Sequence, residues 1–448
     1  MPAGAVVGAE SASSSSVLHD LRMSTPLPDP GPSPLARGEP QLSVAQARDA
    51  ILAAIGPVDG VETVPLSQAV GRILTDDQAS PIDVPAHDNS AMDGFAFDGA
   101  ALAAGQPLRM PVRATVYAGR PHDEPVPPGA CVRIMTGAVM PAGADTVVPV
   151  ELVSLDGGEV LVPAGVVRAG ENLRRRGEDL ARGGVALPAG RVLRPSDLGL
   201  AASLGWATLP VRRKLRVALF STGDEIFAPG EPLPPGGVYD SNRASLRAAL
   251  QRLGLEVIDL GGVRDDPTAL RQVLESAVAQ ADAVVTSGGV SMGDADYTRD
   301  VLATLGEVAF WKVAMRPGRP FAFGPLRAQG RTAWLFALPG NPVAALVTFY
   351  AFAREALLRM AGATSSPPRA LRARSAEAIR KRPGRTEFQR GILGRDAQGE
   401  VVVRLTGSQG AGILRSMSEA DALVVLGHEQ GSVAAGDWVE VWPFEGLV

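Results

Sequence analysis

Residues 215–361 constrain the fold more than any other part of the chain, because short apolar runs alternate there with longer amphipathic runs. The apolar runs have the length of buried strands, and the amphipathic runs have helical spacing. We expect strands at "LRVALFSTG", "EVIDLGGV", "DAVVTSGG", "EVAFWKVAM" and "AWLFALPG", and helices at "SNRASLRAALQRLG", "DPTALRQVLESAVAQA", "YTRDVLATLG" and "NPVAALVTFYAFAREALLRM". This alternation predicts a parallel, doubly wound sheet, whose ligands bind beyond the carboxyl ends of the strands.

Four of these strands lead into polar loops, most of which contain glycine. Glycine lets backbone N–H groups approach a phosphate, while carboxylates need a cation such as Mg²⁺ between them and a phosphate. One acidic loop alone is commonly a helix cap, but four loops at one sheet edge favour a site for phosphate plus Mg²⁺. The loop residues in question are Thr222, Gly223, Asp224, Glu225, Asp265, Ser287, Gly288, Gly289, Ser291, Gly293, Asp296, Pro339, Gly340 and Asn341.

Two basic stretches suggest a second anion site. "KVAMRPGRPFAFG" places Lys312, Arg316 and Arg319 around a Pro-Gly turn, where arginine forks suit a tetrahedral oxyanion. The alternative is a solvated basic turn. "RRRGEDL" at 174–180 also has two interpretations: a charged surface loop or an anion-plus-metal site.

The rest of the chain divides by composition. Residues 1–40 are rich in Ser, Pro and Gly and are expected to be a disordered extension. Residues 81–180 show short β-like runs between Pro/Gly turns, and 370–448 resemble a small β-barrel or sandwich. The stretch "PAHDNSAMDGFAF" at 85–97 is unusually polar, which raises the question whether it faces water or a ligand.

Composition excludes several classes of protein. The formal net charge is -5, so nothing requires nucleic acid or an anionic membrane as a partner. Cys131 is the only cysteine, which excludes an intrachain disulfide, and we expect it to be a buried apolar residue. No apolar run approaches the ~18–20 residues of a membrane helix, so we expect no membrane partner and, by default, a cytoplasmic location.

The ordered motifs resemble the molybdopterin molybdenumtransferase family, which is related to gephyrin and to the plant molybdenum-insertion domains. The similar motifs are "DNSAMDGFA", "RIMTGAVMPAGADTVV", "RRRGEDL", "FSTGDE", "DSNR", "TSGGVSMGDADYT", "RPGRPFAFG" and "LPGNPVAA". They occur in the family's order and cover roughly residues 42–448, leaving the extension 1–40 outside.

The resemblance implies an α/β multidomain subunit. Its parts would be a discontinuous linking domain (41–84 and 181–213), an inserted β-rich domain (85–180), a doubly wound α/β domain (214–362) and a C-terminal β-barrel-like domain (363–448). The family forms homodimers with a cleft shared between subunits. It inserts molybdate into the dithiolene of adenylylated molybdopterin, with Mg²⁺-dependent loss of AMP, and contact with the molybdopterin adenylyltransferase is a further expectation.

The resemblance also implies roles for single residues. Asp93, Asp179, Glu225, Asp265 and Asp296 match acidic, catalytic positions of the cleft, with Glu225 and Asp265 as the metal ligands. Thr136 and Gly137 match the opposite wall, and Lys312 matches a substrate-binding position. Arg316, Arg319 and Arg390 are expected to bind molybdate.

The chain departs from the family pattern at two places. Arg316 and Arg319 stand where many relatives have lysine, so a point donor becomes a fork. Ala411 stands where relatives often have serine; if that hydroxyl helps to hold molybdate, Ser408 or a backbone N–H must replace it. Two other functions stay open: adenylylation of molybdopterin, which a single α/β domain performs, and a non-catalytic scaffold such as gephyrin.

Overall fold

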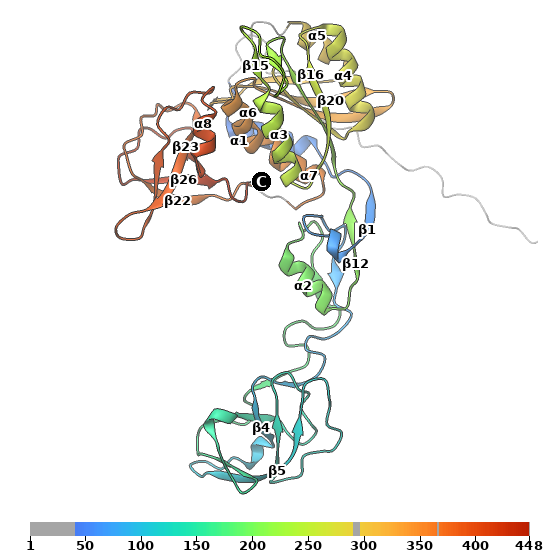
Figure 1. The fold of residues 1–448 in the computed structure, drawn as a ribbon, viewed down its shortest axis with the longest axis vertical. Coiled ribbons are helices and arrows are strands. Elements are labelled where there is room, and N and C mark those ends of the chain that lie inside the picture. Colours follow the sequence, from blue (N-terminus) through green and yellow to red (C-terminus); the bar gives the residue numbers. More distant parts are fainter. Residues whose placement is uncertain (1–40, 290–295, 365–366, 448) are drawn as a thin grey trace, which may run out of the picture.

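The computed structural model describes residues 41–289, 296–364 and 367–447. The predicted extension 1–40 and the predicted site residues Ser291 and Gly293 therefore lie outside the described residues, as does the side chain of Asp296. The chain is elongated, with the α/β and C-terminal regions at one end, the β-rich region at the other and a slender linking region between them (Figure 1).

A six-stranded sheet forms the centre of the α/β region. Its strands, in spatial order, are β16 (Glu256–Val263), β13 (Arg216–Thr222), β17 (Ala283–Ser287), β21 (Arg331–Leu338), β20 (Pro320–Ala328) and β18 (Ala309–Lys312). The first four are parallel to one another, whereas β20 and β18 are antiparallel to their neighbours. All four parallel strands therefore end at the same edge.

Helices cover both faces of this sheet, because successive strand residues point to opposite sides. In β13, Val217 and Leu219 face one core and Ala218 and Phe220 face the other. The first core packs against α1 (Val44–Ala54), α3 (Ser241–Arg252), α6 (Pro342–Thr348), the π-helical segment η4 (Phe349–Ala353) and α7 (Arg354–Met360). The second packs against α4 (Pro267–Gln280) and α5 (Asp296–Leu305).

The helix ends follow their local sequence. Ser43 caps α1 by accepting the N–H of Gln46, whose side chain accepts the N–H of Ser43 in return. Asp266 caps α4, as expected from "DPTA", and Pro267 follows it at the first helical position. The doubly wound fold is thus specified locally as well as by its apolar pattern.

Strand β20 is the element that the sequence pattern missed. No strand was predicted for the stretch from Pro320, which was quoted only as the end of the basic stretch "KVAMRPGRPFAFG". The structure pairs this stretch with both β21 and β18. Pro320 tolerates its place as the first strand residue, and Gly324 lies so close to the Glu307 carbonyl that a side chain would not fit.

The linking region joins chain segments from both sides of the β-rich region. β1 (Val61–Pro65) pairs with β12 (Thr208–Arg212), and β2 (Gln78–Ala79) pairs with β11 (Val185–Leu187). The 3₁₀ turn η1 (Leu66–Gln68) and α2 (Pro195–Ser203) complete it. Its small core includes Leu74 and Val211, which come from the two segments.

The β-rich region is a six-stranded sheet with a core on each face. Phe95 and Phe97 are buried in one core and Ala96 in the other. The strands in spatial order are β7 (Thr146–Pro149), β4 (Gly94–Phe97), β6 (Cys131–Ile134), β5 (Leu108–Val116), β9 (Glu159–Val162) and β8 (Ser154–Asp156). β3 (Asn89–Ser90) pairs with β10 (Leu173–Arg174) beside it, and the 3₁₀ turns are η2 (Gly99–Ala101) and η3 (Val150–Leu152).

The C-terminal region is a closed five-stranded barrel, because the last strand pairs back onto the first. Around the barrel run β23 (Thr386–Arg395), β24 (Val401–Leu405), β22 (Leu371–Ser375), β26 (Trp438–Pro443) and β25 (Ala422–Leu426). β19 (Met315–Arg316), from the α/β region, pairs in parallel with β23, and α8 (Arg415–Glu419) lies beside it. The basic stretch is thereby attached to the barrel.

Candidate functional site

A cavity of about 620 Å³ lies at the carboxyl ends of the parallel strands. Loops from all four strands line it, so the structure brings together most of the loop residues that the sequence singled out. The lining residues are Ser221, Thr222, Gly223 and Glu225 at and after the end of β13, Asp265 after β16, Ser287, Gly288 and Gly289 at and after the end of β17, and Gly340 and Asn341 after β21. Asp224 and Pro339 lie in the same loops.

Hydrogen bonds tie the loops of this cavity to one another. The Asn242 side chain donates to Ser287 Oγ at 2.7 Å and to the Gly340 carbonyl at 2.6 Å. Ser287 Oγ in turn donates to the Pro339 carbonyl at 3.1 Å. Ser221 Oγ donates to Asp240 Oδ1 at 3.0 Å, so the first loop is fixed to the start of α3. The cavity wall is thus positioned by side chains as well as by the sheet.

Close approach explains the glycines after β17. A Cβ on Gly288 would lie 2.5 Å from the carbonyl oxygen of Thr222, and the φ of Gly288 is +96°. Both facts exclude other residues there. The hydroxyl of Thr222 is buried and has no hydrogen-bond partner among the described residues. The two loops therefore meet with their backbones in direct contact.

Three acidic residues, Glu225, Asp240 and Asp265, line the cavity, and the Asp240 carboxylate already accepts hydrogen bonds from Ser221 and Arg243. Asp265 donates its backbone N–H to Asp224 Oδ1 at 3.2 Å, which sets the loop conformation. Beside it, burial and a hydrogen bond to the Asp265 carboxylate raise the pKa of the Tyr297 hydroxyl. Within the described residues no group of three or more His, Cys, Asp or Glu could hold a metal by itself. Glu225 and Asp265 suit Mg²⁺ all the same, because it is usually held by one or two carboxylates, substrate phosphates and water.

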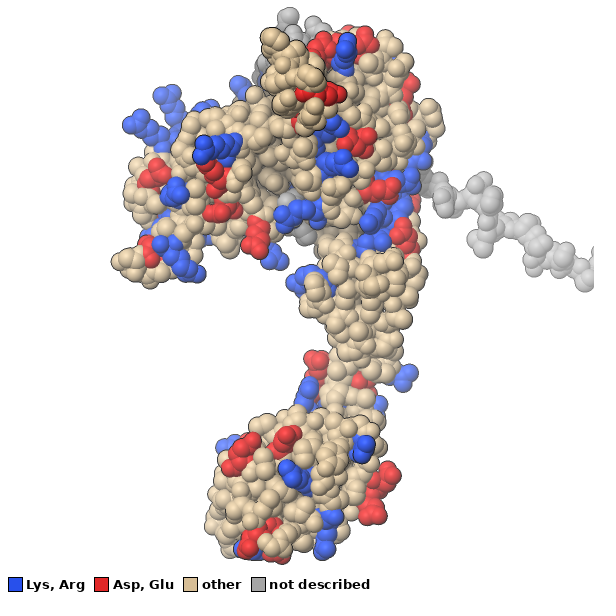
Figure 2. Space-filling model, in the orientation of Figure 1, with Lys and Arg blue, Asp and Glu red and all other residues tan. Residues whose placement is uncertain are grey.

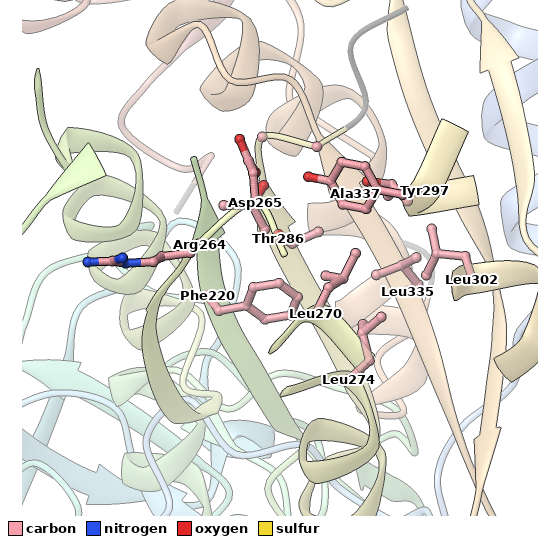
Figure 3. A pocket seen from close by; sticks show the side chains of 14 residues that line it. Phe220, Arg264, Asp265, Leu270, Leu274, Thr286, Tyr297, Leu302, Leu335 and Ala337 are labelled. Atoms are coloured by element: carbon pink, nitrogen blue, oxygen red, sulfur yellow. The ribbon is translucent and has the colours of Figure 1, made fainter. Parts of the chain in front are cut away.

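A second, smaller cavity of about 20 Å³ lies next to the first. Figure 3 shows Asp265 and Tyr297 above it, with the Tyr297 hydroxyl directed toward Asp265, and Phe220, Leu270 and Leu274 below. Thr222, Gly288 and Gly289 line both cavities. This volume is no larger than about one water molecule, so it cannot accommodate the substrate.

Arg390 of β23 is a buried cation without a buried anion. Its exposure is 0%, and burial, with a smaller contribution from Arg316, lowers its pKa to about 10. Nε donates to Ser416 Oγ at 3.0 Å, and Nη2 donates to the carbonyls of Gly410 at 3.1 Å and Ser408 at 3.5 Å. Nη1 is buried and has no partner in the described part of the chain. No carboxylate touches this guanidinium there.

The other predicted basic residues surround Arg390 unequally. Arg316 is exposed at the end of β19 and near enough to act on Arg390 electrostatically. Lys312 is half-buried at the end of β18. Arg319 is exposed, and its guanidinium contacts the Gln41 amide. Among the described contacts, therefore, Arg316 shares the surroundings of Arg390, whereas Arg319 contacts the start of the described chain.

The remaining predicted residues lie in the β-rich region. Asp93 Oδ1 accepts the backbone N–H and the hydroxyl of Thr136, both at 2.7 Å, and these bonds lower the Asp93 pKa. Gly137 follows with a φ of +77°, and Asp179 is exposed beside Val84. Figure 1 places this region at the opposite end of the molecule from the α/β region, whose loops line the cavity. Within one chain the structure does not bring these residues to Glu225 and Asp265.

Three known families cover most of the chain. Residues 42–205 match the MoeA N-terminal region (domain I and II), 218–359 a probable molybdopterin binding domain, and 372–444 the MoeA C-terminal region (domain IV). A molybdopterin molybdenumtransferase of Haemophilus influenzae is 40% identical over 409 residues, which are 91% of this chain and 100% of that protein. The chain belongs to the MoeA family of molybdopterin molybdenumtransferases.

Other MoeA proteins agree. Molybdopterin molybdenumtransferase 2 of Mycobacterium tuberculosis is 39% identical over 394 residues, covering 85% of this chain and 94% of that one. The crystal structure of the molybdopterin biosynthesis moeA protein of Pyrococcus horikoshii superimposes with a TM-score of 0.77 at 27% identity, over 90% of this chain and 100% of that one. The predicted family, multidomain α/β fold, transferase class and place in molybdenum cofactor biosynthesis are confirmed. In the described residues no helix has the length and apolarity to cross a membrane.

Several residues of this MoeA site were missed by the motif analysis. Asn242 belongs to "DSNR", a quoted motif to which no role was given, yet it holds two loops together. Tyr297 follows Asp296 in "GDADYT" and faces Asp265. Gly412 reaches the cavity from the C-terminal barrel, which no local pattern indicates. The first two could have been found from their place at a helix start beside acidic loops.

Proposed function

We propose that this MoeA protein inserts molybdate into the dithiolene of adenylylated molybdopterin, with Mg²⁺-dependent release of AMP. One observation carries the proposal. The loop 406–414 lies between the two candidate anion sites: Gly412 lines the 620 Å³ cavity, and the carbonyls of Ser408 and Gly410 hold Arg390. A substrate with phosphates at one end and a metal-accepting group at the other fits such a paired arrangement.

The cavity is suited to the phosphates of the substrate. Gly223, Gly288 and Gly289 have positive φ angles and no side chains, so their backbones can approach phosphate oxygens closely. Glu225 and Asp265 would hold Mg²⁺, which supplies charge neutralisation at the phosphoanhydride. Asp224 and Tyr297 would orient the Asp265 loop.

The Arg390 surroundings are suited to molybdate. The two N–H groups of Nη1, which have no partner among the described residues, together with the charge of Arg316 make a buried positive site for which the described part of the chain supplies no counter-ion. Ala411 provides no hydroxyl, and Ser408 contributes its carbonyl to Arg390. We propose that the guanidinium fork binds the oxyanion without a hydroxyl at position 411, with Lys312 and Arg319 at the rim.

We further propose a homodimer in which the β-rich region of one subunit completes the cleft of the other. Asp93, Thr136, Gly137 and Asp179 would then face the partner subunit's phosphate site. The separation of the two regions within one chain supports this (Figure 1). So does the linking region, which is mostly uncharged on the face in Figure 2 and exposes Val61, Val70 and Val185. We also infer a cytoplasmic enzyme that receives its substrate from the adenylyltransferase.

The test uses purified full-length protein with adenylylated molybdopterin, MgCl₂ and sodium molybdate. We expect release of AMP together with a cofactor that activates a molybdenum-free apoenzyme. Leaving out molybdate should prevent activation, and chelating Mg²⁺ should prevent AMP release. Transfer of AMP from ATP to free molybdopterin, without metal insertion, would instead assign the chain to the adenylylation step. A dimer that gives neither reaction would favour a scaffold.

A further inference from the structure

The hydroxyl of Ser416 makes an unusual pair of hydrogen bonds next to the candidate oxyanion site. It donates to the Ile413 carbonyl at 2.6 Å and accepts from Arg390 Nε at 3.0 Å. Ser416 is 3% exposed, so water does not compete for either bond. Because its single proton is directed at Ile413, only its lone pairs face Arg390. The hydroxyl therefore acts as a fixed acceptor for the guanidinium.

Arg390 is held at every other group except one. Nη2 is bound by the carbonyls of Gly410 and Ser408. Its backbone is clamped by Gln409, whose Oε1 accepts the Arg390 N–H at 2.7 Å and whose Nε2 donates to the Arg390 carbonyl at 3.2 Å. With Nε and Nη2 both bound, the plane of the guanidinium is fixed. The unpartnered Nη1 then has one direction in which to present its N–H groups.

We propose that Ser416 is a positioning residue of the molybdate site, which orients Arg390 so that Nη1 binds the oxyanion. The inference rests on the proposed function, since it assumes that molybdate is the anion at Arg390. Ser416 itself does not touch the anion. Its effect is to prevent rotation of a side chain that has several rotatable bonds and, among the described residues, no carboxylate that anchors it.

Loss of the Ser416 hydroxyl should change the affinity for molybdate and not the rate at saturating molybdate. Without the hydroxyl, Nε is left buried and unpaired, and the guanidinium can turn to satisfy Nε at the expense of Nη1. Binding of the oxyanion is then weakened, while none of the described hydrogen bonds of Ser416 or Arg390 reaches Glu225, Asp265 or the glycine loops of the cavity. The loss should therefore fall on the affinity for molybdate and not on turnover at saturating molybdate.

The experiment compares full-length wild type with Ser416→Ala, Ser416→Thr and Ser418→Ala. Ser418 is exposed on the same helix and makes no contact with Arg390 among the described residues, so it is the matched control. Sodium molybdate is titrated into each protein by calorimetry, and initial rates are measured against molybdate concentration. The thermal midpoint of each variant is recorded as well.

We expect Ser416→Ala to weaken molybdate binding about tenfold and to raise the molybdate KM by the same factor. Turnover at saturating molybdate should change less than about twofold, and Ser416→Thr, which keeps the hydroxyl, should bind nearly as wild type does. Equal affinity in wild type and Ser416→Ala would overturn the inference. So would a lower thermal midpoint with unchanged affinity, because that outcome describes a structural role only. If wild type itself bound no molybdate, both the inference and the proposed function would fail, and the wild-type titration identifies that case.

Discussion

The β-rich region and the α/β region each contain a carboxylate that was predicted as a site residue, but the two carboxylates differ in their hydrogen bonds and in their surroundings. Asp93 has one oxygen bound twice by Thr136 of its own chain. Asp265 uses its backbone N–H to hold its loop and directs its carboxylate into a cavity beside Tyr297. Asp93 is thus a fixed, ionised acceptor on a surface, whereas Asp265 belongs to a concave site suited to a cation. Asp93 therefore needs another part of the protein to complete a binding site, whereas Asp265 already lines one.

The largest effect should come from Asp265→Asn. This substitution removes a charge from the cavity while keeping the shape of the side chain, and we expect AMP release to fall about thousandfold. Asp266→Asn is the control, because the neighbouring carboxylate caps α4 through the Ala269 N–H at 2.8 Å and does not line the cavity. Steady-state rates at saturating Mg²⁺ measure both. Comparable losses in the two variants would indicate a folding effect and not a cavity effect.

The next effect tests whether the two regions act across subunits. Asp93→Asn should lower turnover about hundredfold, because the cleft shared between the two subunits loses one preorganised hydrogen-bond acceptor. Mixing the impaired Asp93→Asn subunits with the impaired Asp265→Asn subunits should then restore about a quarter of wild-type activity, since half of the dimers are mixed and each has one intact cleft.

Subunit exchange is verified by tagging one variant and purifying mixed dimers. Recovery depends on Asp93 and Asp265 of different chains forming one cleft. If mixed dimers are no more active than either parent variant, the two carboxylates do not share a cleft. The proposal that Asp93 completes the site of the other subunit would then be wrong.

The same comparison explains what the sequence could predict. Thr222, Asp265, Gly288 and Asn341 follow strands that are parallel and adjacent, so topology alone predicts that they meet. Asp266 is predicted as a helix N-cap because Pro267 follows it. No such rule relates Asp93 to Glu225, since their regions are joined only by the linking strands. That relation came from the family resemblance and stays a prediction.

Other features depended on contacts between elements that are distant in sequence. The role of Ser416 arises because α8 lies beside β23, and Gly412 reaches the cavity only because the barrel packs on α6 through the Val343 N–H and the Ala411 carbonyl. Strand β20 contains a proline and a glycine, and its place in the sheet is set by its pairing with β18 and β21. Local propensity contains no information on such neighbours.

A third, smaller effect concerns the junction between the linking and α/β regions. Arg213 donates to both oxygens of Asp282, at 2.7 and 2.9 Å, and its Nε donates to the Asp59 carbonyl. Asp282→Asn should reduce the free energy of unfolding by about 2 kcal/mol at pH 7, as measured by chemical denaturation. Glu307→Gln, in the exposed pair with Arg327, is the control and should cost about 0.5 kcal/mol or less.

The pH dependence of this pair has a definite sign. Burial raises the pKa of Asp282, but hydrogen bonds from Arg213 and from the Arg216 N–H outweigh it and leave the pKa lowered. A carboxyl whose folded pKa is depressed stabilises the fold above its unfolded pKa of about 3.9 and loses that contribution as the pH falls through the folded value. Wild type and Asp282→Asn should therefore converge in stability only below about pH 4. A constant difference down to pH 2 would contradict the assignment.

The smallest effect tests how much the hydrogen bond from the Thr136 hydroxyl contributes to the pKa and function of Asp93. Thr136→Val keeps the backbone N–H bond to Asp93 and removes the hydroxyl bond, so the Asp93 pKa should rise toward its ordinary value without reaching it. Turnover should fall only about threefold, because one of two hydrogen bonds to an exposed oxygen remains. Carboxyl carbon chemical shifts across the acid range report the pKa, and Thr136→Ser, which keeps the hydroxyl, should match wild type. An unchanged Asp93 pKa in Thr136→Val would mean that the backbone N–H alone fixes this carboxylate. The turn at 85–97 would then be organised by main-chain geometry, and the hydroxyl of Thr136 would be free to face the substrate of the partner subunit.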